Sequence, residues 1–195
     1  MIRIRQANFQ DAEAIASLHA QSWRLAYHNI LDADYLRCTL DEDRLHDWLD
    51  RLGGHDDSQY VIVAEDVRNA NTLAGFACAY GAYDHQVGTL LENLHAHPQH
   101  KKQGIGKMLL RQIATWSVHH FPQDALHLWV VAENHPAIGF YSHLGGIQDS
   151  ADIWDAPGGN KVPELRFTWP DPSCLIKTNQ FDMFKNPSYV VPDNS

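Results

Sequence analysis

Apolar residues recur along this chain with two different spacings. Alternating or continuous apolar stretches predict strands at residues 2–5, 60–64, 73–83, 89–97, 125–131, 147–154 and 161–169, with a turn at Asn69-Ala70-Asn71. Helical spacing predicts helices that cover residues 41–52, 104–120 and 136–145, and an earlier helix that Asp11 is expected to cap. The pattern therefore predicts interleaved strands and helices over residues 2–169.

Residues 88–108 contain the most informative stretch of the chain. An apolar segment is followed by a short basic loop, and Gly104-Ile105-Gly106 then opens an amphipathic helix. Glycine lets backbone N–H groups approach a ligand closely, and the first turn of a helix has unpaired N–H donors. Three lysines add positive charge to the same place: Lys101, Lys102 and Lys107. The segment is therefore expected to bind a phosphate or pyrophosphate.

The two best-known phosphate loops do not fit this stretch. A Walker loop requires Lys and then Ser or Thr after its second glycine, whereas here Lys107 is followed by Met108. A dinucleotide fingerprint requires a third glycine where this chain has Leu109. Neither ATP nor NAD is therefore the expected ligand.

Composition narrows the class of protein. A length of 195 residues and a hydrophobic content of 44% predict one folded domain with room for an appendage. A net charge of −9 argues against a nucleic-acid binder and is compatible with a cationic partner. The cysteines are far apart and odd in number, which predicts no disulfide framework. No apolar run is long enough for a membrane span, and the N-terminus lacks the apolar core of a signal peptide, so we expect a cytoplasmic protein.

Two segments resemble motifs of the GCN5-related N-acetyltransferase (GNAT) superfamily. Lys101-Lys102-Gln103-Gly104-Ile105-Gly106 is similar to motif A, Arg/Gln-x-x-Gly-x-Gly/Ala, with Lys101 at the first position. Residues 134–146 are similar to motif B, Asn-x-x-Ala-x-x-Phe-Tyr-x-x-x-Gly-Phe, until Gly146 replaces the final Phe. The two motifs occur in the family's order, separated by one predicted helix and one predicted strand.

The resemblance implies a fold and a domain boundary. The fold is α/β (α+β), a mixed central sheet of about seven strands flanked by helices, in which the fourth and fifth strands are splayed. It covers residues 1–169, and residues 170–195 form a C-terminal extension of unknown role. The apolar side chains of that extension can pack on the domain or on a second subunit, so a homodimer stays open.

The resemblance also implies acetyl-coenzyme A as cosubstrate, entering the gap between the splayed strands. The backbone of the fourth strand would bond the pantetheine amides, the glycine loop the pyrophosphate, and Asn134 the pantetheine arm. The residues expected to bind the cofactor are Leu94, His95, Ala96, Lys101, Lys102, Gln103, Gly104, Ile105, Gly106, Lys107, Asn134 and Ala137.

Acetyl transfer to an amine requires a group that takes the ammonium proton and a group that protonates the leaving thiolate. Tyr141 occupies the family's position for the general acid. Glu92 is the candidate base, because strand alternation places its side chain on the same face as Leu94 and Ala96. A structural ion pair is the alternative for Glu92, and His95 is a second candidate base.

Trp23 and Tyr27 lie where many small-molecule GNAT enzymes form one wall of the acceptor cleft. The same two aromatics, four residues apart, would equally suit a helix face packed into the core. The His-x-His-x-x-His series formed by His95, His97 and His100 could present imidazoles to zinc or iron, but no acidic residue stands at complementary spacing nearby, so we expect no metal.

The predicted function is N-acetyl transfer to a primary amine by direct attack in a ternary complex, with a small-molecule amine as acceptor. A peptide or protein acceptor is the alternative within the same chemistry. A noncatalytic coenzyme A sensor or interaction module is the alternative from another class, favoured by Gly146, the histidine-rich fourth strand and the extension.

Overall fold

The computed structural model describes residues 1–69 and 72–177 of the chain. Its elements are β1 (Ile2–Gln6), α1 (Ala12–Tyr27), α2 (Leu40–Gly53), β2 (Gln59–Asp66), β3 (Thr72–Asp84), β4 (Gly88–Ala96), α3 (Ile105–His120), β5 (Ala125–Val131), α4 (His135–His143), β6 (Ile147–Asp155), β7 (Lys161–Trp169) and α5 (Ser173–Ile176). All predicted strands and helices are present, with ends that differ by a few residues. Ala70 and Asn71 of the predicted turn lie outside the described residues.

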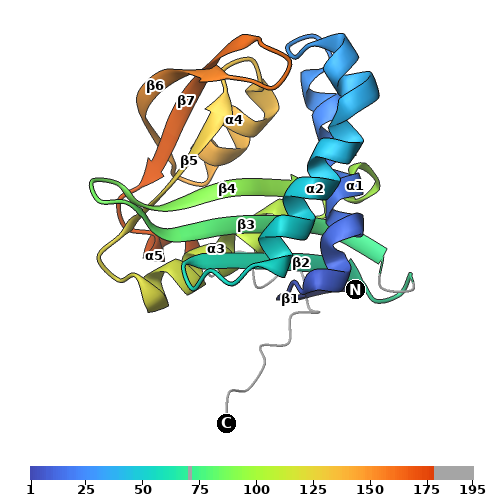
Figure 1. The fold of residues 1–195 in the computed structure, drawn as a ribbon. Coiled ribbons are helices and arrows are strands. Elements are labelled where there is room, and N and C mark those ends of the chain that lie inside the picture. Colours follow the sequence, from blue (N-terminus) through green and yellow to red (C-terminus); the bar gives the residue numbers. More distant parts are fainter. Residues whose placement is uncertain (70–71, 178–195) are drawn as a thin grey trace.

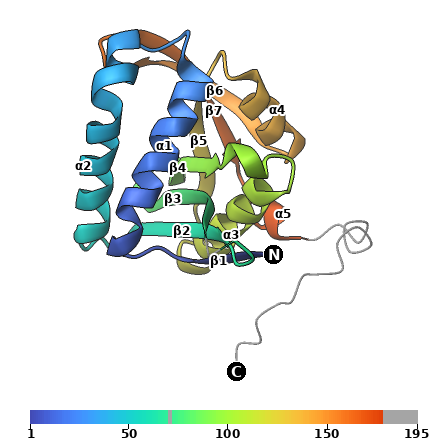
Figure 2. The same cartoon turned by 90° about the vertical axis from the view of Figure 1, so that its right-hand side faces the viewer.

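The strands form one mixed sheet in the order β1-β2-β3-β4-β5-β7-β6 (Figure 1). Every neighbouring pair is antiparallel except β4 and β5, which run parallel. Figure 2 shows α1 and α2 on one face of the sheet and α3 and α4 on the other. The predicted α/β fold with seven strands flanked by helices is therefore confirmed.

The sheet divides between β4 and β5. The two strands pair only where residues 88–90 face residues 125–127, and no pairing continues to the ends of the strands at Ala96 and Val131. Beyond that point β5 keeps its antiparallel partner β7, while β4 keeps β3. The expected splaying of the fourth and fifth strands is thus present.

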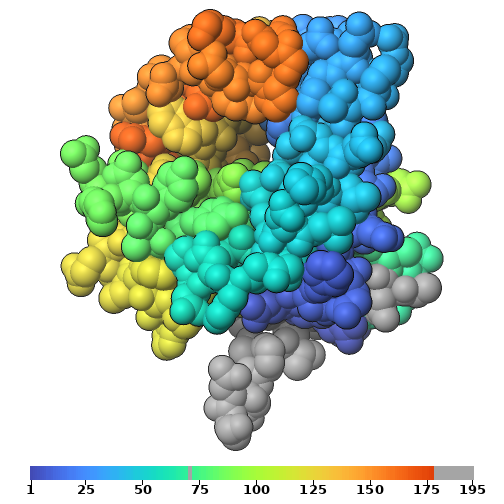
Figure 3. All heavy atoms as spheres, in the orientation of Figure 1, coloured from blue at the N-terminus to red at the C-terminus, as the bar shows by residue number. Residues whose placement is uncertain are grey.

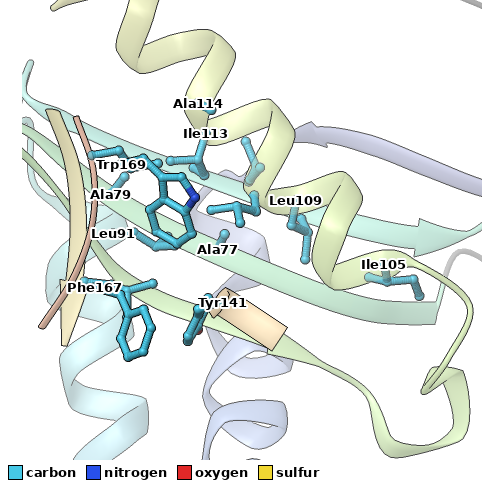
Figure 4. Close-up of a cluster of buried hydrophobic side chains, with 14 of the residues drawn as sticks. Ala77, Ala79, Leu91, Ile105, Leu109, Ile113, Ala114, Tyr141, Phe167 and Trp169 are labelled. Carbon is cyan, nitrogen blue, oxygen red and sulfur yellow. The ribbon is translucent and has the colours of Figure 1, made fainter. Parts of the chain in front are cut away.

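Apolar side chains fill both faces of the sheet. On one face Ile105, Leu109 and Ile113 recur at helical spacing along α3 and are fully buried against the strands. Figure 4 shows these side chains in one cluster with Phe167 and Trp169 of β7. The opposite face is covered by α1 and α2, whose buried residues pack on β2 and β3.

The start of α1 differs from the expectation. Asp11 does not cap this helix, because its carboxylate accepts hydrogen bonds from the Arg5 guanidinium at 2.7 Å and from the backbone N–H of Asn8 at 2.8 Å. A 3-10 turn at Phe9–Asp11 precedes the helix, and Asn8 caps that turn by accepting from the Gln10 N–H at 3.0 Å. The ion pair with Arg5 instead joins this corner to β1.

The beginning of the C-terminal extension packs on the domain. Leu175 and Ile176 of α5 contact the cluster on the α3 face. Most of the extension lies outside the described residues, so its role and the domain boundary at residue 169 stay predictions. Within the described part of the chain, no helix combines the length and the apolar character that crossing a membrane requires.

Candidate active site

The loop before α3 has the geometry of an anion site. Gly104, the residue that precedes the helix, adopts a left-handed conformation with φ of +80°, and no atom lies within 4 Å of where its Cβ would be. Lys102 is also left-handed, with φ of +63°, and Lys101, Lys102 and Gln103 are exposed. Because no side chain caps the helix, its first N–H donors are available to a phosphate.

Ile105 and Gly106, the two residues after Gly104, fix the loop to the core and do not project a side chain into the anion site. Ile105 is 1% exposed and lies in the α3-face cluster. A Cβ on Gly106 would lie 3.3 Å from the Phe140 ring of α4, so glycine at this position lets the two helices approach closely. These residues can therefore contribute to anion binding only through their backbone.

The free edge of β4 suits a ligand that carries amides. Leu94, His95 and Ala96 pair with β3 on one side, opposite Ala77, Phe76 and Gly75 respectively. On the other side the strand no longer pairs with β5. An extended chain with its own donors and acceptors can complete such an edge by β-augmentation. The glycine loop begins eight residues after Ala96, so both halves of the expected cofactor site are adjacent along the chain.

Glu92 does not share a face with Leu94 and Ala96, so this part of the prediction is wrong. Ala79 pairs with Leu91 and Cys78 with Asn93, which leaves Glu92 as the extra residue of a β-bulge. The bulge shifts the alternation by one residue. Leu94 and Ala96 pack on the α3-face cluster, whereas Glu92 contacts α2 on the opposite face.

The partner of Glu92 is Arg51, near the C-terminal end of α2. Both guanidinium Nη atoms donate to the carboxylate, and Nη2 lies 2.9 Å from Oε1. The same guanidinium lies 5.3 Å from the centre of the Trp48 ring. The ion pair considered for Glu92 is thus present, and its role as base stays a prediction.

Tyr141 lies at the edge of the α3-face cluster, next to Phe167 in Figure 4. Its ring is 6.2 Å from that of Phe167 and 6.1 Å from that of Trp169, and the residue is 9% exposed. Burial raises the pKa of Tyr141, and the nearby Tyr27 raises this pKa further. The hydroxyl therefore stays protonated and able to donate at neutral pH.

The departure from motif B at Gly146 has a packing cause. A Cβ on this residue would lie 2.9 Å from the Trp169 ring and 3.1 Å from the Tyr141 carbonyl oxygen. The Trp169 indole, which donates to the Leu144 carbonyl at 2.9 Å, occupies this region. A phenylalanine at position 146 would not fit beside this tryptophan.

Asn134 connects two parts of the site. Its Oδ1 accepts from the Ala137 N–H at 3.3 Å and so caps α4. Burial raises the pKa of Tyr27, a hydrogen bond from the Asn134 side chain opposes that change, and the charge of Glu164 adds to it. Tyr27 of α1 therefore lies within electrostatic reach of Asn134 in the β5–α4 loop, Tyr141 of α4 and Glu164 of β7.

Sequence patterns had not indicated Glu164. On β7 it alternates with apolar residues, as a solvent-facing residue of a half-buried strand does, and this pattern cannot distinguish it from an ordinary surface carboxylate. The packing of the β6–β7 hairpin against α1, in the cluster that holds Trp23 and Val162, brings it within electrostatic reach of Tyr27.

The two predicted acceptor aromatics differ in exposure. Trp23 is 9% exposed and packs edge-on against Tyr27 and against Trp154 of β6, with ring centres 5.8 and 5.7 Å apart. The Arg44 guanidinium covers its ring at 4.8 Å. Trp23 therefore has the environment of a core aromatic, whereas Tyr27 is only partly buried. Their substrate-binding role stays a prediction.

The three histidines of the His-x-His-x-x-His series do not converge. His95 lies against His19 of α1, with ring centres 4.7 Å apart, and burial lowers the pKa of His95 to about 4. His97 lies beyond the end of β4, and its Nδ1 accepts from the Gln99 N–H at 3.2 Å. Among residues 1–69 and 72–177, no three His, Cys, Asp or Glu side chains are grouped as a metal site requires.

Figure 3 shows a hollow on the sheet face that α1 and α2 partly cover. It is bordered by β6 and β7, by α2 and by the β3–β4 hairpin, with β5 at its floor. Trp129 of β5 and Arg166 of β7 lie on this face, where the guanidinium is 5.7 Å from the indole centre. Glu92 and Glu164 face the same side. This surface therefore combines an aromatic ring, a guanidinium group and two carboxylates.

Two strands part beside a helix that begins at a glycine, and the next helix carries a tyrosine. This arrangement is the one expected of a coenzyme A-dependent acetyltransferase. The chain belongs to the acetyltransferase (GNAT) family, whose sequence model matches residues 14–145. It is an acetyl-CoA-dependent N-acetyltransferase, and the residues described above suit the cosubstrate.

Known proteins agree with this assignment. An uncharacterized N-acetyltransferase, YuaI of Bacillus subtilis (strain 168), is 29% identical over 178 residues, which are 90% of this chain and 96% of that protein. The PaiA N-acetyltransferase of Thermoplasma acidophilum, solved in complex with coenzyme A, superposes with a TM-score of 0.64 at 20% identity, over 84% of this chain and 98% of its own. A spermidine N-acetyltransferase SpeG chimera of Vibrio cholerae and hSSAT gives 0.63 at 16% identity, over 90% and 99%.

Proposed function

We propose that this enzyme transfers acetyl to the primary amine of a small cationic molecule by direct attack in a ternary complex. The observation that carries the proposal is the parting of β4 and β5, because it leaves one free strand edge between the glycine loop and the hollow. Cosubstrate and acceptor could then approach one another from the two faces of the sheet. No covalent enzyme intermediate is needed for such an arrangement.

The chain's own groups suit the binding of acetyl-coenzyme A, which supplies an activated acetyl thioester. The backbone of residues 94–96 would bond its amides, and the exposed loop and the first turn of α3 would hold its pyrophosphate, with Lys101 and Lys102 adding charge. Because the Asn134 oxygen already caps α4, this residue would offer only its amide N–H groups to the pantetheine arm.

Tyr141 is the proposed donor to the leaving sulfur. Transfer from a free phenol to a free thiolate is uphill, since the two pKa values are ~10 and ~8.5, and burial of Tyr141 increases the difference. The tyrosine would therefore donate as the carbon–sulfur bond breaks and regain a proton from the attacking nitrogen. A hydroxyl that stays protonated over the working pH range suits that role.

The sequence predicts Glu92 as the base, acting directly or through a water molecule. Its position on the hollow side of β4 supports access to an acceptor there, whereas its bond to Arg51 restricts its movement. The Glu92 and Glu164 carboxylates on the hollow side of the sheet support a small ammonium compound as acceptor. The spermidine acetyltransferase among the structural neighbours acts on a compound of that kind, as its name states.

The test is release of free thiol from acetyl-coenzyme A with a panel of diamines, monoamines, amino acids and peptides. We expect turnover with small cationic amines, at a rate that Tyr141→Phe lowers at least ~100-fold without changing cofactor affinity. Tyr60→Phe is the matched control. Tyr60 lies away from the site, and its ring stacks on that of Trp116 with the ring centres 5.0 Å apart. Tight cofactor binding without turnover on any acceptor would favour the sensor, and turnover on peptides alone would favour the protein acetyltransferase.

The cofactor loop has its own matched pair of variants. Gly104 and Gly159 both have positive φ, of +80° and +89°, with open space around the missing Cβ. Alanine at either position therefore costs a similar ~1 kcal/mol in backbone strain. We expect Gly104→Ala alone to weaken acetyl-coenzyme A in calorimetry. Equal affinities of the two variants would exclude the loop as the pyrophosphate site.

A further inference from the structure

Glu164 of β7 has an unusual environment for a carboxylate. It is half-buried, and within residues 1–69 and 72–177 it forms no ion pair with Lys, Arg or His. Across the β6–β7 pair it lies directly opposite Asp152, which has the same charge. Two like charges in opposite positions destabilise a strand pair, so the fold alone gives no reason for this arrangement.

The position of Glu164 is fixed by strand register. It pairs with Val131, the last residue of β5, in the part of the sheet where β4 and β5 have already separated. Paired residues of antiparallel strands point to the same face, and Val131 packs with Trp23 in the cluster under α1. The side chain of Glu164 therefore faces the acceptor side of the gap.

Tyr27 connects this position with the rest of the proposed site. It is close enough to respond to the charge of Glu164 and to the Asn134 side chain, and it in turn influences the pKa of Tyr141. Tyr141, the proposed proton donor to the sulfur, packs in the cluster on the α3 face, whereas Glu164 shares a face with Val131 on the α1 side. In the proposed function the amine approaches from this α1 side.

Its chemistry agrees with its position. Burial raises the pKa of the Glu164 carboxyl group, and the neighbouring charge of Asp152 raises it further. A carboxylate with a raised pKa takes up a proton more readily than an exposed one, and general bases are most effective when their pKa approaches the working pH.

Glu92 is less suited to carry a proton. Both of its oxygens are bonded by Arg51, whose side chain is 19% exposed between α2 and β4. Protonation of Glu92 would break the closest ion pair of that guanidinium and leave it, among the described residues, only Asp47, at 3.6 Å, and the loss of one partner of a largely buried pair is destabilising. The pair fastens the β4 bulge to α2 and so has a structural explanation that Glu164 lacks.

We propose that Glu164 is the carboxylate that takes the proton from the acceptor ammonium. One ammonium proton moves to Glu164, and the freed lone pair forms the nitrogen–carbon bond to the acetyl carbonyl while the carbon–sulfur bond breaks. The sulfur leaves with its electron pair and takes the Tyr141 proton. The second nitrogen proton returns to the Tyr141 oxygen, so one proton in all passes from Glu164 to solvent.

This assignment rests on the proposed function, and the pH profile of kcat/KM tests it. We expect kcat/KM of the natural protein to rise with pH over the range in which Glu164 of the free enzyme loses its proton. This rise is the acidic limb of the pH profile. Glu164→Gln should abolish that limb and lower kcat at least ~100-fold, with unchanged affinity for acetyl-coenzyme A. Glu164→Asp should restore the limb at a reduced rate. Glu92→Gln should leave the limb in place.

Asp152→Asn supplies a readout that a structural role of Glu164 would not produce. Removing this neighbouring charge lowers the pKa of Glu164, so the limb should move to lower pH while kcat on its plateau changes little. Protection against thermal unfolding by acetyl-coenzyme A shows whether each variant is folded. If Glu164→Gln does not fold, Glu164→Asp and Asp152→Asn decide by the position of the limb.

The two proposals fail in different ways. A limb that persists in Glu164→Gln, or one that Asp152→Asn does not move, would overturn the assignment to Glu164 while acetyl transfer itself stands. If the natural protein binds acetyl-coenzyme A but releases no thiol with any amine, the proposed function fails instead.

Discussion

Replacing His95 should make the stability of this protein less sensitive to acid. His95 projects from β4 towards α1, where its ring lies 4.7 Å from that of His19 and 5.0 Å from that of Phe76. Burial in this aromatic environment disfavours the imidazolium and lowers the pKa of His95 to about 4. The pKa of His19 is also lowered, by burial and by the charges of His95, Arg44 and Arg51. Both imidazoles are therefore neutral in the folded protein at pH 7.

The sign and size of the effect follow from linkage. Below pH 6.5 the unfolded chain binds a proton at His95 more readily than the folded chain does, so stability falls as the pH falls. The contribution is fully present above pH 6.5 and is lost between pH 6.5 and about 4. At ~1.4 kcal/mol for each pH unit, this amounts to at most about 3 kcal/mol, because His95 keeps part of its surface exposed. His19 adds to the loss with the same sign.

The assay is urea unfolding between pH 7.5 and 4.5 at constant salt, in the absence of acetyl-coenzyme A. We expect the unfolding free energy of the natural protein to fall with pH more steeply than that of His95→Gln, by up to ~1.4 kcal/mol per pH unit. His55→Gln, which removes a side chain that is 90% exposed, controls for the loss of a histidine as such. Parallel curves for the natural protein and His95→Gln would refute the inference that burial neutralises His95.

Two further substitutions test the packing around the site by chemical unfolding. Gly146→Ala should lower the unfolding free energy by ~1–3 kcal/mol, because the added methyl group meets Trp169 at 2.9 Å. Gly139→Ala is the control, because a Cβ added at this position in α4 would have no atom within 4 Å. It should leave the unfolding free energy unchanged or raise it by up to ~1 kcal/mol. Equal effects of the two substitutions would contradict this explanation. Trp48→Phe should lower the unfolding free energy by ~1–3 kcal/mol, because it removes the hydrogen bond that the indole N–H donates to the buried Nδ1 of His19 at 3.0 Å. A loss no larger than that of an exposed substitution would show that water replaces the indole.

The sequence was sufficient for the parts of this protein that local patterns determine. Each strand and helix carries its own apolar spacing, and the conformation of Gly104 agrees with the need for glycine before α3. Resemblance to two motifs then predicted the splayed strands, which the register of β4 and β5 confirms. These features depend on residues that are close together in the chain.

Features that depend on distant strands were not predictable in the same way. The bulge at Glu92 arises from pairing with β3, and nothing in β4 itself shows where the alternation shifts. Arg51 meets Glu92 across 41 residues of sequence, and Glu164 comes within electrostatic reach of Tyr27 only because the β6–β7 hairpin packs against α1. Glu164 had the ordinary appearance of a solvent-facing strand residue, whereas simple alternation assigned Glu92 to the wrong face. Their chemistry depends on which element lies opposite, and a linear pattern does not contain that information.

The division of the sheet also connects stability with activity. Trp23, Leu31 and Val162 belong to a third apolar cluster that joins α1 to the end of β5 and to the β6–β7 hairpin. This cluster gives the second half of the sheet an apolar anchor away from β4, so burial of these side chains offsets the strand pairing that is lost beyond residues 90 and 127. The edge left on β4 is costly to expose until a ligand pairs with it. Acetyl-coenzyme A should therefore stabilise the folded protein by completing the edge, and the packing that keeps the gap open also positions Tyr27 and Glu164 beside it.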